Sequence, residues 1–280
     1  MTVALRDLAP GLRLWSRSAT VDAARARLGA GASIGSDPAI TLIGSGDYHH
    51  LAVLLIEQAA EPVTIVHFDN HPDWVRWAPR WHCGSWVNQA LRVDRVAKVV
   101  TIGPTSADLT RPQLKGANLA ALAAGRIALF PWQHEPSRVW GRFPDGAGHR
   151  YEDGYLVWRN LAQSGSVENS RVILDEIKTD AVWLSIDKDV LAESEALTNW
   201  DQGQMPLAAI CELISAIGTR KRIVGADICG EYSEPSMANL LKRIESRVDR
   251  PRRMPDRDAL ARNEAVNRVL LATIARAAAS

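Results

Sequence analysis

The stretch His67-Phe68-Asp69-Asn70-His71-Pro72-Asp73 places potential metal ligands at every second residue. The four residues before it, Val63-Thr64-Ile65-Val66, are apolar or β-branched and predict a buried strand. Because alternate side chains of an extended chain share a face, Asp69, His71 and Asp73 are expected to converge on one point. Acids gathered at the end of a buried strand are costly without a counter-charge. The stretch therefore predicts a divalent cation site.

A second acidic cluster, Ser185-Ile186-Asp187-Lys188-Asp189, ends another apolar segment. Asp187 and Asp189 are expected to share a face, with Lys188 pointing away. Together with Asp69 and Asp73 they carry four negative charges, which balance two divalent cations. Imidazole with carboxylate suits Mn, Zn, Fe or Ni, whereas an all-oxygen Ca or Mg site would not need a histidine.

A third cluster, Gly44-Ser45-Gly46-Asp47-Tyr48-His49-His50, follows an apolar segment that starts at Ile40. Its glycines permit a tight turn over the sheet edge, from which His49 or His50 could reach a metal. A structural histidine pair and a phosphate-binding turn are the alternatives. The dinucleotide fingerprint and the P-loop lysine are both missing from this stretch, which weakens the phosphate alternative.

Apolar strand candidates alternate with helical segments along the chain. The expected strands are residues 40–46, 63–68, 98–103, 126–130, 181–186 and 222–228, and the expected helices are 50–60, 86–93, 114–124, 207–217 and 263–278. This alternation predicts an α/β fold with a mostly parallel sheet, in which ligands bind beyond the carboxyl ends of the strands. Residues 141–154 are rich in Gly and Asp and predict a loop excursion, so one domain over residues 1–280 is the preferred organisation.

Composition excludes several classes of protein. The 33 basic and 32 acidic residues nearly cancel, so nothing global favours nucleic acid or an anionic membrane as a partner. No apolar run reaches the roughly 18 residues of a membrane-spanning helix, and the N-terminus lacks the apolar core of a signal peptide. Cys83, Cys211 and Cys229 are too widely spaced for a disulfide framework, which favours a reducing cytoplasm.

Taken in order, three segments resemble the motifs of the ureohydrolase superfamily of arginase, agmatinase and formimidoylglutamase. They are Gly-Asp-Tyr-His-His-Leu-Ala (46–52), Asp-Asn-His-Pro-Asp (69–73) and Ser-Ile-Asp-Lys-Asp (185–189). The family patterns are Gly-Gly-Asp-His-Ser-Leu-Ala, Asp-Ala-His-x-Asp and Ser-x-Asp-x-Asp. The resemblance implies a three-layer αβα sandwich with a mostly parallel central sheet, as in arginases and deacetylases, and a homo-oligomer, either trimer or hexamer.

The resemblance also implies two divalent metal ions, foremost Mn²⁺ with Ni²⁺, Fe²⁺ or Zn²⁺ as alternatives, and a bridging hydroxide. One ion would be held by His49, Asp69, Asp73 and Asp187. The other would be held by His71, Asp69, Asp187 and Asp189. Shifting the first motif by one residue would put His50 in place of His49.

Two further segments resemble catalytic parts of the family. His82-Cys83-Gly84-Ser85 is similar to a His-Gly-Thr segment, in which a histidine assists proton transfer to the leaving group. The segment that starts at Asp227-Ile228-Cys229 is similar to a strand end at which a glutamate orients the guanidinium. Gly230 occupies the glutamate position in a gap-free alignment, so Glu231 is the expected residue and Glu234 the alternative.

The loop Trp74-Val75-Arg76-Trp77-Ala78-Pro79-Arg80-Trp81 is the most distinctive departure from the family. Trp74, Trp77, Trp81 and Trp86 could form an aromatic wall over a cationic or apolar substrate. Arg76 and Arg80 could instead hold a carboxylate. A third interpretation is that these tryptophans pack a subunit interface.

The combined interpretation is a binuclear-metal hydrolase that cleaves a C–N bond of a guanidino or amidino small molecule. Alternatives are a metal-dependent amide deacylase and a non-catalytic binding protein that retains the fold. A cysteine nucleophile, Cys83 with His82, is disfavoured because adjacent residues of an extended segment face opposite ways.

Overall fold

A six-stranded parallel sheet forms the centre of the computed structural model, which describes residues 2–31, 39–77, 79–234, 237, 239–248 and 257–280. The strand order is β2-β11-β10-β3-β5-β6. The bounds are Ala39–Leu42 (β2), Val63–Phe68 (β3), Val96–Ile102 (β5), Ile127–Phe130 (β6), Ala181–Asp187 (β10) and Arg222–Cys229 (β11). This order makes β11, β10 and β3 neighbours, so their carboxyl ends meet at one place.

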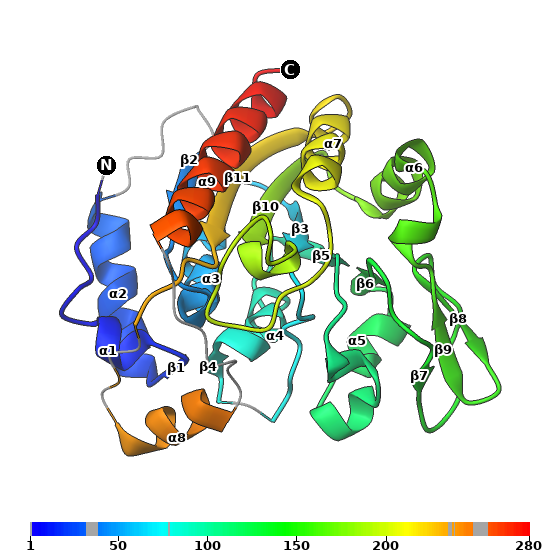
Figure 1. Cartoon of the computed structure of the whole chain (residues 1–280), viewed down its shortest axis with the longest axis horizontal. Helices are drawn as coiled ribbons and strands as arrows, with labels where there is room; N and C mark the ends of the chain where they lie inside the picture. Colours follow the sequence, from blue (N-terminus) through cyan, green and yellow to red (C-terminus); the bar gives the residue numbers. More distant parts are fainter. Residues whose placement is uncertain (1, 32–38, 78, 235–236, 238, 249–256) are drawn as a thin grey trace.

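Helices cover both faces of the sheet (Figure 1). One face carries Ser18–Gly31 (α2), Ala52–Ile56 (α3), Trp86–Ala90 (α4) and Leu119–Ala123 (α5). The other carries Ser166–Glu176 (α6), Leu207–Gly218 (α7) and Arg257–Ala278 (α9). The short helices Ala9–Leu12 (α1) and Leu240–Val248 (α8) lie at the periphery. The predicted αβα sandwich is confirmed.

Alternating side chains of the strands feed two separate cores. In β10, Ala181 and Trp183 pack into the core under α2 to α5, while Val182, Leu184 and Ile186 pack into the core under α6, α7 and α9. Strands buried on both faces read as continuous apolar runs, which is why the sequence pattern located them.

Smaller elements depart from the expected pattern. The predicted helix 50–60 is a 3₁₀ turn, Gly46–Leu51 (η1), followed by the short α3. The predicted helix 114–124 is interrupted at Gly116, whose φ of 75° is left-handed. The 141–154 excursion contributes to an antiparallel sheet of Ser137–Arg138 (β7), Tyr155–Trp158 (β9) and His149–Glu152 (β8). This antiparallel sheet, α2 and α6 are not among the elements expected from the sequence. A single domain over residues 1–280 stays a prediction.

A second small sheet has two strands and connects the N-terminal segment to the segment after β3. Trp15–Ser16 (β1) pairs antiparallel with Trp81–His82 (β4), which joins the N-terminal segment to the segment that carries His82. Across the ranges that the structure describes, no helix is both long and apolar enough to span a membrane.

Close packing of two strands positions a buried tryptophan. A Cβ atom at Gly225 would lie 2.2 Å from the Trp183 ring, so only glycine fits there. The Trp183 indole N–H donates to Asp227 Oδ2 at 2.6 Å in the buried interior.

We expect Gly225→Ala to lower the free energy of unfolding by about 1–3 kcal/mol, because the Trp183 ring would have to move in a close-packed core. Gly29→Ala is the matched control. Nothing lies within 4 Å of its Cβ position in α2, so it should raise stability by about 0.5–1 kcal/mol through helix propensity. Urea denaturation measures both, and equal effects of the two variants would contradict the packing argument.

Candidate metal centre

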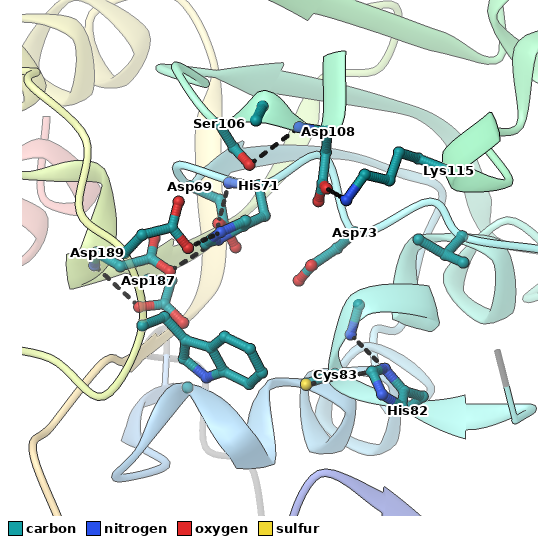
Figure 2. A pocket seen from close by; sticks show the side chains of 16 residues that line it. Asp69, His71, Asp73, His82, Cys83, Ser106, Asp108, Lys115, Asp187 and Asp189 are labelled. Carbon is teal, nitrogen blue, oxygen red and sulfur yellow. Dashed lines mark hydrogen bonds and ion pairs between the residues drawn. The ribbon is translucent and has the colours of Figure 1, made fainter. Parts of the chain in front are cut away.

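A pocket of about 340 Å³ opens at the carboxyl ends of β3 and β10. Asp69, His71, Asp187 and Asp189 lie close together on one side of it, and His82 and Cys83 lie on another (Figure 2). Five of the six predicted metal ligands line the pocket, and His49 lies buried directly behind them. The pocket is small, which suits a small-molecule ligand.

The first candidate ion position is centred on His49 Nδ1. This nitrogen lies 3.2 Å from Asp69 Oδ2, 3.4 Å from Asp73 Oδ2 and 3.7 Å from Asp187 Oδ2. All four side chains are buried. They come from η1, from the loop after β3 and from the end of β10.

The second candidate position lies around His71 Nδ1. This nitrogen lies 3.0 Å from Asp189 Oδ2 and 3.5 Å from Asp69 Oδ1. Asp69 therefore presents one oxygen to each position, as a bridging ligand does.

The local backbone differs from the extended strand that the sequence suggested. Strand β3 ends at Phe68, and the Asp69 carboxylate accepts a 2.6 Å hydrogen bond from the His71 backbone N–H. Asp73 has a left-handed φ of 46°. The expectation that alternation along a strand brings Asp69, His71 and Asp73 together is therefore wrong. A turn brings them together instead, one in which the first carboxylate bonds to the backbone two residues further on.

The same turn chemistry operates after β10. Asp187 Oδ1 accepts from the Asp189 backbone N–H at 3.0 Å and starts the 3₁₀ turn Lys188–Val190 (η6). Lys188 points away from the site into the interior, as the sequence suggested, and binds the carboxylate of Glu231.

Buried polar groups hold His49 from behind. His49 Nε2 lies 2.9 Å from Ser185 Oγ, and that hydroxyl donates to Asp227 Oδ1 at 2.8 Å. Partners of this kind orient a metal-binding imidazole and select its tautomer. The supporting role of Asp227 is not among the roles expected from the sequence, although an acid within an apolar strand signals a buried polar network.

Two aromatic or imidazole groups support the aspartates in the same way. The Trp86 indole N–H donates to Asp73 Oδ2 at 2.7 Å, and the Trp86 ring packs 4.7 Å from that of His49. His67 Nε2 lies 2.9 Å from Asp69 Oδ2. His67 stands two residues before Asp69 in the stretch 67–73, and this spacing was the sequence signal for its contact with that carboxylate.

The gathered carboxylates shift one another's proton affinity. Burial and the neighbouring Asp69 raise the pKa of Asp73 to about 6. Burial and nearby carboxylates also raise the pKa of Asp187 and hold that of Asp189 well above its usual range. Burial acts the same way on Asp69, but His67, His49 and His71 outweigh it and hold its pKa well below the usual range. Such mutual repulsion is what a bound cation would relieve.

The fit of a metal ion is supported by a buried nitrogen. Within the described part of the chain, His49 Nδ1 makes no hydrogen bond although three carboxylate oxygens surround it. A buried polar atom left in this way is costly unless something else binds it. A divalent ion between one imidazole nitrogen and three carboxylates satisfies this requirement with ordinary ligand chemistry.

The structure distinguishes the two adjacent histidines. His50 is buried on the opposite side of η1, with Nε2 3.4 Å from Ser16 Oγ. Burial lowers the pKa of His50 to about 3. The geometry thus brings His49, and not His50, to the aspartates.

His82 lines the pocket from β4. Its Nδ1 accepts the Gly84 backbone N–H at 2.9 Å, so the neutral ring carries its proton on Nε2. Cys83 lies beside it, with Sγ 3.9 Å from His82 Nδ1. Burial raises the pKa of the Cys83 thiol, which opposes the thiolate that a nucleophile requires.

Glu231 does not occupy the position that was predicted for it. Its carboxylate binds Lys188, Asn267 and Asn263 and is absent from the described residues that line the pocket. Glu234, the alternative, is an exposed side chain that is also absent from that lining. Glu231 is therefore a partner for a buried lysine.

The tryptophan-rich loop does not form an aromatic wall. Trp74, Trp81 and Trp86 are buried in the core under α2 to α5, because their large rings fill space between the loop and those helices. Trp77 is 67% exposed and lies outside the metal-site pocket, over Gly116. Arg80 binds Gln89 and stacks on Trp81, and neither it nor Arg76 lines the metal-site pocket.

Comparisons with known proteins agree with the fold. No family model matches the chain. A protein of Thermotoga maritima described as uncharacterized is 29% identical over 195 residues, which cover 69% of this chain. The chain spans 58% of the length of that relative.

Solved structures of several ureohydrolases resemble the chain. Proclavaminate amidino hydrolase from Streptomyces clavuligerus matches with a TM-score of 0.55 and 18% identity, covering 94% of this chain and 72% of its own. Formimidoylglutamase from Bacillus subtilis matches with a TM-score of 0.60 and 15% identity, covering 93% and 67%. Agmatinases and arginases match as well. The chain thus has the ureohydrolase fold that the motifs suggested.

Asp187→Asn tests the metal centre. At a Mn²⁺ concentration of about 100 times Kd, the wild type should gain about 2.7 kcal/mol of stability, and Asp187→Asn should lose that gain because it removes a ligand charge. Glu231→Gln is the matched acid-to-amide control. It should lower stability without metal by about 3 kcal/mol, since Lys188 loses its charged partner, yet keep the manganese effect. Thermal unfolding with and without Mn²⁺ measures both, and a retained effect in Asp187→Asn would remove that residue from the site.

Proposed function

We propose that the protein is a binuclear metal-dependent hydrolase that cleaves a C–N bond of a guanidino or amidino small molecule. The observation that supports the proposal is that the Asp69 carboxylate lies between the two candidate ion positions. Asp69 faces His49 with one oxygen and His71 with the other, inside a pocket of an arginase-like fold.

The ligand set that we propose is the one predicted from sequence. His49, Asp69, Asp73 and Asp187 would hold one ion, and His71, Asp69, Asp187 and Asp189 would hold the other. The four carboxylate charges balance two divalent cations. Manganese is the foremost candidate because of the resemblance to ureohydrolases, and the oxygen and imidazole donors also suit Ni²⁺, Fe²⁺ or Zn²⁺. Two such ions would act as Lewis acids and lower the pKa of water, which supplies the nucleophile.

The chain's own residues then have defined tasks. Ser185 and Asp227 hold the His49 ring, and Trp86 holds the Asp73 carboxylate. His82 carries a proton on Nε2 that it can exchange with the departing nitrogen. Water adds to the central carbon, the C–N bond breaks, and the departing nitrogen takes a proton. A guanidine would yield urea and an amine, and an amidine would yield an amide and ammonia.

The assay of this proposal is the release of urea or ammonia by manganese-loaded protein from guanidino acids, guanidino amines and formimino compounds. We expect turnover on at least one of these classes and loss of turnover after chelation or in Asp187→Asn. Less than one metal ion per chain after manganese loading, with no turnover on any class, would sink the proposal.

His82→Asn separates proton transfer from metal binding. We expect kcat to fall about 100-fold, the usual contribution of a general acid or base, while KM and bound metal change little. Steady-state kinetics with metal analysis provides the measurement. An unchanged kcat would assign His82 a purely structural task in the β1–β4 pairing.

A further inference from the structure

The pocket contains more negative charge than two ions need. Six aspartates stand among the described residues that line it: Asp69, Asp73, Asp108, Asp187, Asp189 and Asp201. Four of these are the candidate ligands, whose charges two divalent ions would cancel. Asp108 lies 3.6 Å from the Lys115 ammonium and is thereby balanced. Asp201 is the acid that is left.

Asp201 is bound to a candidate ligand and still open to the pocket. Its Oδ1 lies 2.9 Å from His71 Nε2, and its side chain is 55% exposed. A histidine that ligates a metal is neutral, so this hydrogen bond would leave the negative charge of Asp201 in place. The loaded pocket would then carry one excess negative charge at this carboxylate.

The loop that carries Asp201 is held firmly in place. The Gly203 backbone N–H donates to the Asp189 backbone carbonyl at 2.6 Å. Asn70, itself buried, donates from Nδ2 to the Asp201 backbone carbonyl at 3.0 Å and to the carboxylate oxygen Oδ2 of Asp201 at 3.3 Å. Asn199 accepts from Ser45 Oγ at 2.9 Å on the other side of the loop. A carboxylate fixed in advance binds a ligand charge without a large ordering cost.

Among the described residues directly after β11, neither Gly230 nor Glu231 can offer a second free acid to the pocket. Gly230 follows β11 with a φ of 88°. A Cβ atom there would lie 2.4 Å from Asp187 Oδ1 and 2.6 Å from the backbone nitrogen of Lys188. That position cannot carry a side chain. The next residue, Glu231, is bound to Lys188 instead.

We propose that Asp201 is the specificity-determining residue that binds the cationic group of the substrate. The inference rests on the proposed function and narrows it. The substrate carries a positive charge near the reacting carbon, as a guanidinium or amidinium does, and neutral amides and ureas are disfavoured. Because Asp201 also contacts His71, the test has to separate charge recognition from the positioning of that ligand.

Butylguanidine and butylurea are suitable probes because they share a shape and differ in charge. Calorimetric titration of manganese-loaded wild type should show butylguanidine binding at least about 10-fold tighter than butylurea, as expected for a charge-assisted hydrogen bond. In Asp201→Asn this preference should fall to about one. The amide oxygen still accepts from His71 Nε2, so manganese affinity should stay within about 3-fold of wild type. Asp108→Asn, the matched control on the same pocket, should keep the preference.

Each contrary result has a distinct meaning. An equal affinity of wild type for both probes, or a preference that survives in Asp201→Asn, would overturn the inference. Loss of manganese from Asp201→Asn would also overturn it and make Asp201 a positioning residue for His71. A charge preference that depends on Asp201, in a protein without turnover, would support the inference and reject the proposed hydrolase. Turnover together with a charge preference that does not depend on Asp201 would support the proposed hydrolase and reject the inference about Asp201.

Discussion

The repulsion among four buried carboxylates is the constraint on which the rest of the site depends. Asp69, Asp73, Asp187 and Asp189 come from the ends of two neighbouring strands and cannot all be ionised in a buried pocket without a counter-charge. The raised pKa values of Asp73, Asp187 and Asp189 express burial together with that repulsion, whereas His67, His49 and His71 hold the pKa of Asp69 well below its usual range. Two divalent ions would offset all of that repulsion.

The surrounding fold is organised to keep those carboxylates in place. Trp86, a fully buried side chain of α4, holds Asp73, and Trp183 holds Asp227 from within β10. Gly225 leaves room for the Trp183 ring. The tryptophans that appeared in sequence to be candidates for substrate contact mostly stabilise the core and the ligands. Under the proposal made above, substrate recognition would fall instead to Asp201 in the pocket wall, whose loop is held by hydrogen bonds to Asn70 and Asp189.

Sequence pattern located the strands and the ligands well because both follow local rules. Strands such as β3 and β10 are continuous apolar runs, and their ends carry the acids. The turn that brings Asp69, His71 and Asp73 together was not predictable from the two-residue periodicity of a strand. It depends on the hydrogen bond from the His71 backbone N–H to the Asp69 carboxylate and on the left-handed backbone of Asp73. The role of Glu231 was mistaken for a related reason. Its nearest cation, Lys188, is close only in the folded chain.

The sequence by itself determined the class of fold and the six candidate ligands, since burial patterns and motif order are properties of the chain. The tertiary structure alone decided which histidine faces the aspartates, which tryptophans are core, and which acid remains for a ligand. Those questions turn on contacts between residues more than 100 positions apart, such as His71 with Asp201 and His49 with Ser185. The order β2-β11-β10-β3 in the sheet brings such residues together.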